Sequence, residues 1–304
     1  MPWLIAIALL TWVFWGIPLG KFMGALSQGQ FSWFIPAMAL CMISIFFADC
    51  LAISKTFSWF TTDFPYREVL PIRGASYLLS VINYNLGQGA LVLFAKRAKG
   101  VTIGRATGTV LMLMGINLVV LLILSAVGLF IADAPRALAF RPWVLGLMGA
   151  FVVYLVAITW KPAFLARVSL AEPMLNAGLR GHLAAVAVRV PHLSLVLFAH
   201  YIAMRAFGIE PPLHVFASTM PFVMLMSTIP ISPQGLGTTQ VAAVYFFAPY
   251  AQGDAATREA TILAYSLTTS VMAILFMLTM GFLYFRTGMR LLHLAQEKDD
   301  GAGS

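Results

Sequence analysis

The sequence predicts an all-α polytopic integral membrane protein with about six spanning helices and two re-entrant helical hairpins. Of the 304 residues, 61% are hydrophobic and 10% are charged, whereas about a quarter of the residues in a soluble domain are charged. No charged residue occurs between Arg105 and Asp133, or between Glu259 and Arg286. Each of these runs exceeds the ~20 residues that cross a bilayer, so membrane helices account for most of the chain.

A single transmembrane domain over residues 1–290 is expected, followed by a short cytoplasmic tail over residues 291–304. The net charge of +8 fits basic loops held near anionic lipid, and no nucleic-acid partner is expected. Cys41 and Cys50 lie in one apolar run, so no disulfide framework is indicated. The N-terminal segment has no basic n-region and no evident cleavage site, which favours a retained helix over a signal peptide.

Six apolar segments are candidates for full spans, and several are bounded by Trp, Tyr or Phe, as interfacial belts are. In chain order they are Trp3–Leu19, Trp33–Ile53, Thr107–Ile131, Trp143–Trp160, His192–Gly208 and Thr261–Phe285. Two further regions are apolar but interrupted. Leu70–Ala95 contains "NYNLGQG" at its middle, and Leu213–Tyr250 contains "PISPQGLG".

Each interruption carries residues that break helices at a depth where backbone amides need covering. The predicted break residues are Gly87, Gly89, Pro230, Pro233, Gly235 and Gly237. Non-helical backbone inside a membrane is tolerated only where protein or a water-filled cavity covers it. Each region is therefore interpreted as a re-entrant hairpin with a polar apex.

The distribution of basic residues predicts the topology. With a cytoplasmic N-terminus and two hairpins, only Lys21, Arg136, Arg141 and Arg258 lie outside, and most of the 19 basic residues lie inside. The positive-inside rule predicts such a bias, so both termini are expected in the cytoplasm. The halves, about 1–132 and 142–286, would then form an inverted repeat, as in transporters with a midplane substrate site.

The segment Glu172–Val190 has a helical stripe of apolar residues with basic side chains beside it. The stripe consists of Leu175, Leu179, Leu183, Val186 and Val190. Two interpretations remain open. The segment is either an interfacial helix lying on the inner leaflet or a linker helix packed on the bundle.

Polar side chains at the two apices are the candidate substrate-binding residues, because half-helix ends near the midplane present free N–H groups and a partial positive charge. The candidates are Arg73, Asn83, Tyr84, Asn85 and Gln88 in the first region and Ser232, Gln234, Thr238, Thr239 and Gln240 in the second. The alternative is that these side chains satisfy only each other and the broken backbone.

Other polar residues in the apolar segments have structural explanations. Arg205 and Asp49 lie near the ends of predicted spans, where a long or polar side chain reaches the interface. His200 and Asn117 lie in mid-span and are interpreted as satisfied packing residues. Arg73 is expected to face a cavity or a partner.

The two interrupted regions resemble the signature regions of the flippase-like membrane domain of lysylphosphatidylglycerol synthases. Arg73, Asn83, Asn85, Gly87, Gly89 and Arg97 follow the order of the first signature, and Pro233, Gly235, Leu236 and Gly237 follow that of the second. Gln240 stands where the family often has Glu, and the soluble aminoacyl-transfer domain is missing. The resemblance implies lipid movement, without lipid aminoacylation, in the inner membrane of a prokaryote.

The expected function is binding or translocation of a lipid or lipid-linked substrate between leaflets, without nucleotide hydrolysis. No hydrolase, zinc-protease or Asp-rich metal motif is found, so no catalytic residue, metal site or cofactor is predicted and the protein is expected not to be an enzyme. Two alternatives are a metal-free lipid-modifying transferase and a scaffold for a membrane glycosyltransferase. The expected partner is a membrane phospholipid or a lipid-linked substrate. A second copy of the chain or a membrane enzyme is a further candidate partner.

Overall fold

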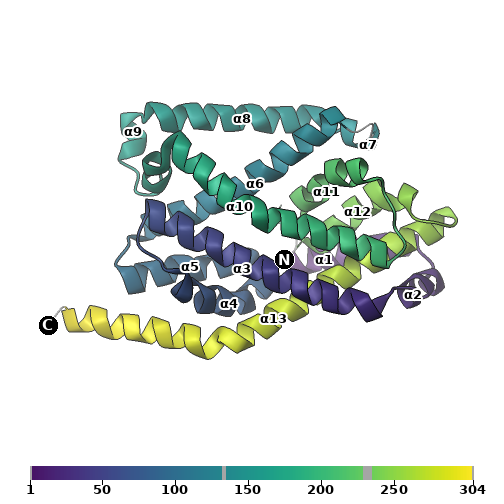
Figure 1. The fold of residues 1–304 in the computed structure, drawn as a ribbon, viewed down its shortest axis with the longest axis horizontal. Helices are drawn as coiled ribbons and strands as arrows, with labels where there is room; N and C mark the ends of the chain where they lie inside the picture. Colours follow the sequence, from purple (N-terminus) through teal and green to yellow (C-terminus); the bar gives the residue numbers. More distant parts are fainter. Residues whose placement is uncertain (1, 132–134, 229–234, 303–304) are drawn as a thin grey trace. The chain divides into compact units, whose positions relative to one another are not determined.

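The computed structural model describes residues 2–131, 135–228 and 235–302, and every regular element in these ranges is a helix (Figure 1). In chain order these are α1 (Pro2–Trp15), α2 (Leu19–Ser27), α3 (Phe31–Phe60), α4 (Tyr66–Ile82), α5 (Tyr84–Lys99), α6 (Ile103–Ile131), α7 (Pro135–Leu138), α8 (Arg141–Trp160), α9 (Ala163–Ala166), α10 (Glu172–Ala206), α11 (Leu213–Thr228), α12 (Thr238–Phe247), the 3₁₀ turn η2 (Ala248–Tyr250) and α13 (Ala255–Ala302).

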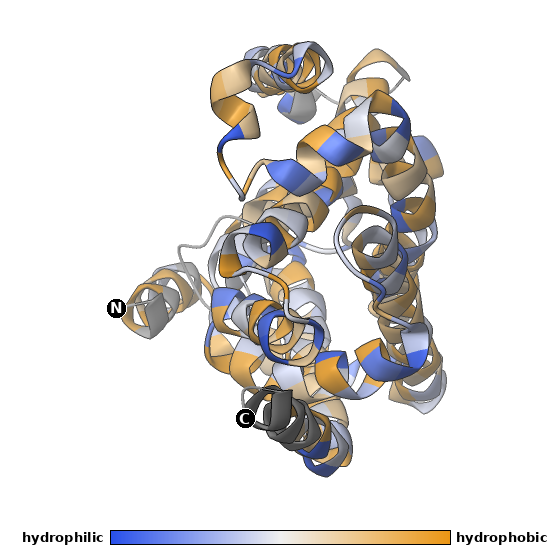
Figure 2. Cartoon of the chain, turned by 90° about the vertical axis from the view of Figure 1, so that its left-hand side faces the viewer, coloured by the Kyte–Doolittle hydropathy of each residue, from blue (hydrophilic) through white to orange (hydrophobic). Residues whose placement is uncertain are grey.

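Five of the described helices are long and apolar enough to cross a membrane. They are Phe31–Phe60, Ile103–Phe130, Arg141–Trp160, Glu172–Ala206 and Ala255–Leu292. Apolar colours dominate the ribbons of the long helices (Figure 2). The chain is therefore an all-α polytopic membrane protein, as the sequence predicts.

The first predicted span, Trp3–Leu19, is shorter in the structure. Helix α1 ends at Trp15 and has 14 residues, which reach about 21 Å at 1.5 Å per residue, less than the ~30 Å hydrocarbon core. Pro18 then precedes the first turn of α2, where its missing N–H costs nothing. At the other end of the chain, α13 continues to Ala302, so most of the predicted tail extends the last helix.

The predicted division between an interfacial segment and a separate span at His192 is wrong. Helix α10 (Glu172–Ala206) consists of two helical segments that meet at a kink at Gly178, and its longer segment continues through Pro191 and His192. Gly178 has a φ of 53°, which glycine adopts without the Cβ penalty of other residues. The break in this part of the chain therefore lies at Gly178 and not at His192.

The faces of α10 are the reverse of those expected for a helix packed through its apolar stripe. Leu179 is 46% exposed and Leu183 is 61% exposed, whereas His182 and Arg189 are buried. His182 forms a hydrogen bond of 2.7 Å with the hydroxyl of Tyr154. Leu175, which precedes the kink at Gly178, is buried. In a membrane helix the outer face meets lipid and polar groups need partners inside, so Leu179 and Leu183 mark the lipid-facing side.

The first interrupted region is a helical hairpin in which α4 and α5 pack along each other (Figure 1). The break is confined to Asn83, whose backbone is extended, and the Asn83 side chain accepts a hydrogen bond of 2.8 Å from the Asn85 backbone N–H. The prediction that Gly87 and Gly89 form the break is wrong, because both lie within α5. That the hairpin is re-entrant stays a prediction.

The described backbone divides into two compact units. The first comprises residues 1–44, 121–148 and 194–275, and the second comprises residues 45–120, 149–193 and 276–304. The predicted inverted halves, about 1–132 and 142–286, are a separate division of the chain and stay a prediction.

The second unit holds an apolar core with aromatic side chains at its centre. Phe46 packs edge-on against Tyr77 and also contacts the ring of Tyr284, while Phe64 stacks on Phe94. Glycines permit close approach of α4 and α13 in this unit. A Cβ at Gly74 would overlap the ring of Tyr284, and a Cβ at Gly281 would lie within 2.6 Å of the Leu78 side chain.

The first unit is built around α11 and α12, which pack against each other, and α1 also contacts α12. An aromatic cluster joins Phe140, Phe222 and Phe246. At its solvent-exposed end, Lys21 forms an ion pair of 2.5 Å with Asp254. Hydrogen bonds from Lys21 and Thr257 hold the pKa of Asp254 below its usual range.

Candidate functional site

The most unusual feature of the second unit is a cluster of charged side chains contributed by membrane helices. Asp49 lies on α3 in the apolar run "ISIFFADCLAIS", Arg73 lies on α4, and Arg189 and His192 lie on α10. Asn117 on α6 completes the group. We call these five residues the charge cluster.

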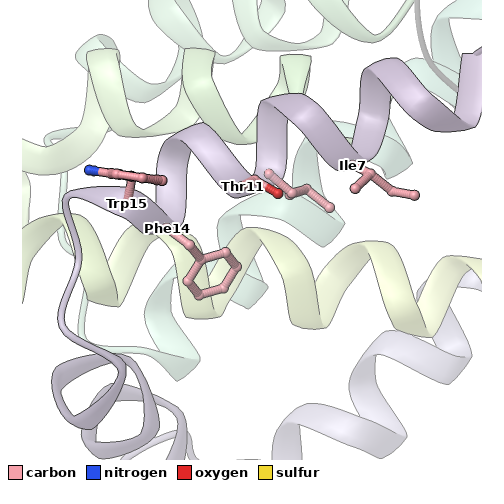
Figure 3. A pocket seen from close by; sticks show the side chains of 5 residues that line it. Ile7, Thr11, Phe14 and Trp15 are labelled. Carbon is pink, nitrogen blue, oxygen red and sulfur yellow. The ribbon is translucent and has the colours of Figure 1, made fainter.

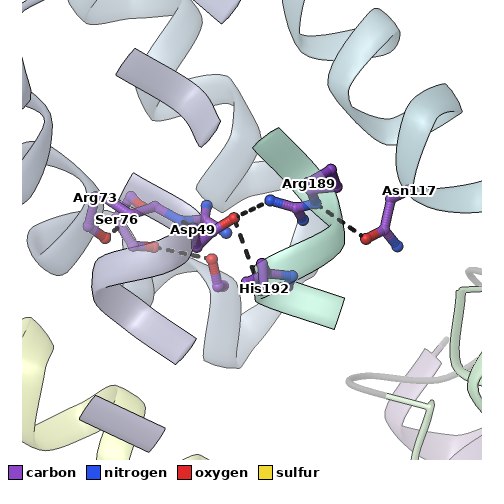
Figure 4. Close-up of polar contacts among 7 residues, drawn as sticks. Asp49, Arg73, Ser76, Asn117, Arg189 and His192 are labelled. Atoms are coloured by element: carbon purple, nitrogen blue, oxygen red, sulfur yellow. Dashed lines mark hydrogen bonds and ion pairs between the residues drawn. The ribbon is translucent and has the colours of Figure 1, made fainter. Parts of the chain in front are cut away.

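The carboxylate of Asp49 bridges the two arginines. Arg73 Nε donates to Asp49 Oδ2 at 2.7 Å, and Arg189 Nη1 donates to Asp49 Oδ1 at 2.5 Å. Arg189 Nε donates to Asn117 Oδ1 at 3.2 Å, and His192 Nε2 lies 4.0 Å from Asp49 Oδ1. Figure 4 shows Asp49 between the two arginines. The arrangement ties four helices together at one point.

The charge cluster is almost completely removed from solvent. Asp49 is 3% exposed, Arg73 is 6% exposed and Arg189 is 8% exposed. Ions buried in this way cost several kcal/mol each unless good geometry and further hydrogen bonds offset the loss of water. Charged groups within membrane segments are rare and usually mark a substrate or ion pathway.

The surroundings of Arg73 hold its side chain in place. Its guanidinium lies over the ring of Tyr77, 5.1 Å from the ring centroid, which adds a cation–π attraction. Ser76 donates to the Arg73 carbonyl at 2.8 Å (Figure 4). Arg73 Nη1 nevertheless has no hydrogen-bond partner among the described residues, and the same is true of His192 Nδ1.

Of the predicted binding residues in the first region, only Arg73 belongs to the charge cluster. Asn83 caps α5, as described above. Tyr84 and Asn85 are exposed, and Gln88 is buried. Sequence reasoning thus identified one member of the cluster, and the substrate-binding roles of the polar residues at the apex stay predictions.

The second region lies in the first unit, and the described part of its "PISPQGLG" segment begins at Gly235. Ser232, Gln234, Pro230 and Pro233 lie outside the described residues. Gly235 and Gly237 have φ values of 69° and 88°, conformations that L side chains rarely adopt. Their predicted role in the break is therefore consistent with the backbone, which turns sharply just before α12 begins at Thr238.

The side chains that follow this turn mostly satisfy the broken backbone. Thr238 Oγ1 donates to the Gly235 carbonyl at 3.0 Å. Gln240 is fully buried, and its Oε1 accepts from the Gly237 N–H at 2.6 Å. Thr239 Oγ1 is buried without a partner among the described residues. The alternative of backbone capping describes Thr238 and Gln240 well, and their roles in substrate binding stay predictions.

Gln240 stands between two hydrogen-bonding neighbours. Gln240 Nε2 donates to Ser270 Oγ at 3.1 Å, and Ser270 Oγ in turn donates to the Ser266 carbonyl at 2.9 Å. A carboxylate can accept from Gly237 but carries no N–H for this Ser270 oxygen. The amide therefore serves both neighbours without placing a charge in a buried position.

Four members of the charge cluster were missed as site residues by the sequence. Asp49 was assigned to the end of a predicted span, but the six predicted spans contain no other acidic residue, and that isolation was the usable signal. Arg189 was counted with the cytoplasmic loops, although the apolar run from Leu183 to Phe198 surrounds it. Asn117 stood out as a polar residue in mid-span but was interpreted as a packing residue, and its hydrogen bond with Arg189 makes it a member of the cluster. His192 was placed only at the start of a predicted span.

Two other intramembrane candidates have the structural roles expected of them. Arg205 is exposed and pairs with Glu210 at 3.2 Å. His200 Nδ1 forms a hydrogen bond of 2.8 Å with the buried hydroxyl of Tyr265. Neither residue adds to the charge cluster.

An apolar pocket of about 450 Å³ lies along α1 in the first unit. Its lining includes Ile7, Thr11, Phe14 and Trp15 (Figure 3). It carries no charged group, so it offers an acyl chain apolar contact but no headgroup recognition. Among the described residues, no group of three or more His, Cys, Asp and Glu is placed to hold a metal ion.

Comparison with known proteins gives one match. Residues 2–281 match the family described as the lysylphosphatidylglycerol synthase TM region. No curated protein and no solved structure matches the chain.

Proposed function

Because this chain belongs to the lysylphosphatidylglycerol synthase TM-region family, we propose that it binds a membrane lipid or lipid-linked substrate and moves it between leaflets without nucleotide hydrolysis. The observation that carries the proposal is the charge cluster of Asp49, Arg73 and Arg189. Three ionised side chains inside membrane helices cost more than a packing role requires, and such groups usually belong to a substrate pathway.

A transport role fits the chemistry of the cluster better than an enzymatic one. Its carboxylate, Asp49, accepts hydrogen bonds from arginine N–H groups on both oxygens, and no second carboxylate among the described residues belongs to the cluster. General acid–base catalysis requires a group able to exchange a proton with the substrate. We therefore infer that the protein is not an enzyme.

The proposed location is the inner membrane of a prokaryote, with both termini in the cytoplasm. The charge bias of the loops supports this orientation. Single cysteines introduced at residues 96–100 should be labelled from the cytoplasmic side, and those at 251–254 from the outer side. Labelling of both segments from one side would contradict the orientation.

Translocation is tested by reconstitution. Purified protein in liposomes carrying a fluorescent phospholipid should make the label of both leaflets accessible to a membrane-impermeant quencher, whereas protein-free liposomes should expose only the outer leaflet. Arg189→Gln should slow this exchange about tenfold or more, because hydrogen bonds to charged groups are worth about 1.5–3 kcal/mol. Arg205→Gln, the same change at an exposed arginine, is the matched control and should leave the rate unchanged.

The same lipid-exchange measurement can overturn the proposal. If neither acidic, zwitterionic nor cationic phospholipids exchange faster with the folded protein than without it, lipid translocation is not its function. Turnover of a headgroup by the pure protein would favour the transferase alternative. Loss of a membrane glycosyltransferase on deletion of the gene would favour the scaffold alternative.

A further inference from the structure

The charge cluster has an unbalanced charge. Arg73 and Arg189 each carry one positive charge, and Asp49 is the acidic partner recorded within 4.0 Å of either guanidinium among the described residues. With His192 neutral, the group therefore bears one uncompensated positive charge. A net charge in a buried membrane position is costly, so an additional anion would stabilise the cluster.

The hydrogen-bonding capacity of the cluster is also incompletely used. Asp49 contacts Arg73 through Nε and Arg189 through Nη1, one nitrogen each. Arg73 Nη1 is buried and has no partner among the described residues. A buried donor without an acceptor is destabilising, and more so when the group is charged.

The unused donors belong to the residue type best suited to phosphate. A guanidinium presents N–H groups in a rigid fork that matches two oxygens of a phosphate. Asn117 positions Arg189 by accepting from its Nε at 3.2 Å, and the ring of Tyr77 supports Arg73. The two forks are thus held in fixed orientations around one carboxylate.

We propose that the charge cluster is an anion site for the phosphate of an acidic lipid headgroup, and that Asp49 occupies it as an internal counter-ion when no lipid is bound. The proposal rests on the lipid-binding function proposed above and names its headgroup chemistry. Because Arg73 Nη1 is buried, phosphate reaches it only when one of the four helices moves. The ion pairs of Asp49 with Arg73 and Arg189 hold those helices together until the phosphate takes the place of Asp49 at one of the two arginines.

This exchange gives Asp49 and Arg73 effects of opposite sign on binding. Asp49→Asn removes the competing carboxylate and should tighten binding of an acidic lipid about three- to tenfold. Arg73→Gln removes the guanidinium that binds the phosphate and should weaken binding of an acidic lipid about tenfold or more. If the cluster serves only to hold helices together, both changes lower stability and neither changes the preference among lipids.

The experiment measures binding by calorimetry to the full-length protein in a non-ionic detergent at constant ionic strength. The probes are dihexanoyl-phosphatidylglycerol, dihexanoyl-phosphatidylcholine, dihexanoylglycerol, which lacks a phosphate, and inorganic phosphate alone. Wild-type protein should bind phosphatidylglycerol most tightly and dihexanoylglycerol most weakly. Arg205→Gln is the matched control, because Arg205 is exposed and pairs with a different acid.

Several outcomes decide the matter. Equal binding of phosphatidylglycerol by wild type and Arg73→Gln would overturn the site. Equal binding of phosphatidylcholine would overturn the preference for an acidic headgroup. A further outcome is that inorganic phosphate binds as tightly as phosphatidylglycerol, with the same dependence on Arg73. That result would show that the site binds phosphate and would overturn the assignment of the phosphate to a lipid headgroup.

Should Asp49→Asn fail to fold, Arg73→Lys provides the test, since it keeps the charge but loses the fork. Phosphatidylglycerol binding should then weaken about threefold or more while the melting temperature without lipid stays close to that of wild type. Unchanged binding would overturn the proposal. Lipid binding that depends on Arg73 in a protein that moves no lipid would overturn the transport function and leave this site intact.

Discussion

The two interrupted regions carry the same Gly-x-Gly pattern but use it in different ways. In the second unit, Gly87 and Gly89 lie inside α5, and the break consists of Asn83 alone. In the first unit, Gly235 and Gly237 both have positive φ and form part of the break itself. A glycine pair between apolar runs therefore indicates either a turn of the backbone or a close approach of two helices.

The largest expected effect comes from the backbone of the first unit. Replacing both Gly235 and Gly237 by Ala should destabilise the protein by about 2–6 kcal/mol if the two costs add, because each non-glycine residue at such a φ costs about 1–3 kcal/mol. Thermal unfolding in detergent, followed by tryptophan fluorescence, measures the loss. An unchanged melting temperature would show that the backbone there adopts ordinary φ values.

The next effect tests close packing in the second unit. A Cβ at Gly87 would overlap the Ser80 hydroxyl and lie 3.1 Å from the Ser76 carbonyl oxygen. Gly87→Ala should cost about 1–3 kcal/mol, as overpacking of a dense interior does. Adding Ser80→Ala should recover part of the loss, because it removes the hydroxyl but leaves the Ser80 Cβ 2.9 Å away. A loss that Ser80→Ala does not change would argue against this contact.

The third test compares the two amide caps, one of which should match the loss at Gly87 and the other fall below it. Gln240→Ala removes the acceptor of the Gly237 N–H and the donor to Ser270 in a fully buried position, which should cost about 1–3 kcal/mol. Asn83→Ala removes one N-cap bond from a half-buried side chain and should cost about 1 kcal/mol. Chemical denaturation measures the loss in the free energy of unfolding for each variant. A larger loss for Asn83→Ala than for Gln240→Ala would contradict this prediction.

The smallest change should be stabilising. A Cβ at Gly89 would meet open space, and the residue is helical. Gly89→Ala should therefore raise stability by about 0.5–1 kcal/mol through helix propensity. The same melting measurement tests it, and a clear destabilisation would indicate that the backbone at Gly89 approaches another element or a bound molecule.

The sequence alone determined the class of the protein. Charge-free runs longer than a bilayer crossing have one stable solution, the helix, because lipid offers no partner to backbone amides. Composition and hydropathy therefore predicted the long helices α3, α6, α8 and α13 and the break near Asn83. The family follows from the motifs around both breaks, which are local in sequence.

Only the tertiary structure decided which polar residues belong together. Asp49 and Arg189 are 140 positions apart, and no spacing rule relates residues so distant in the chain. The orientation of the apolar stripe in α10 was left open for a related reason, since an apolar stripe beside basic residues is compatible with either side facing inward. What resolved both was the cost of an unpaired charge in a membrane, which requires partners that only the packing of helices supplies.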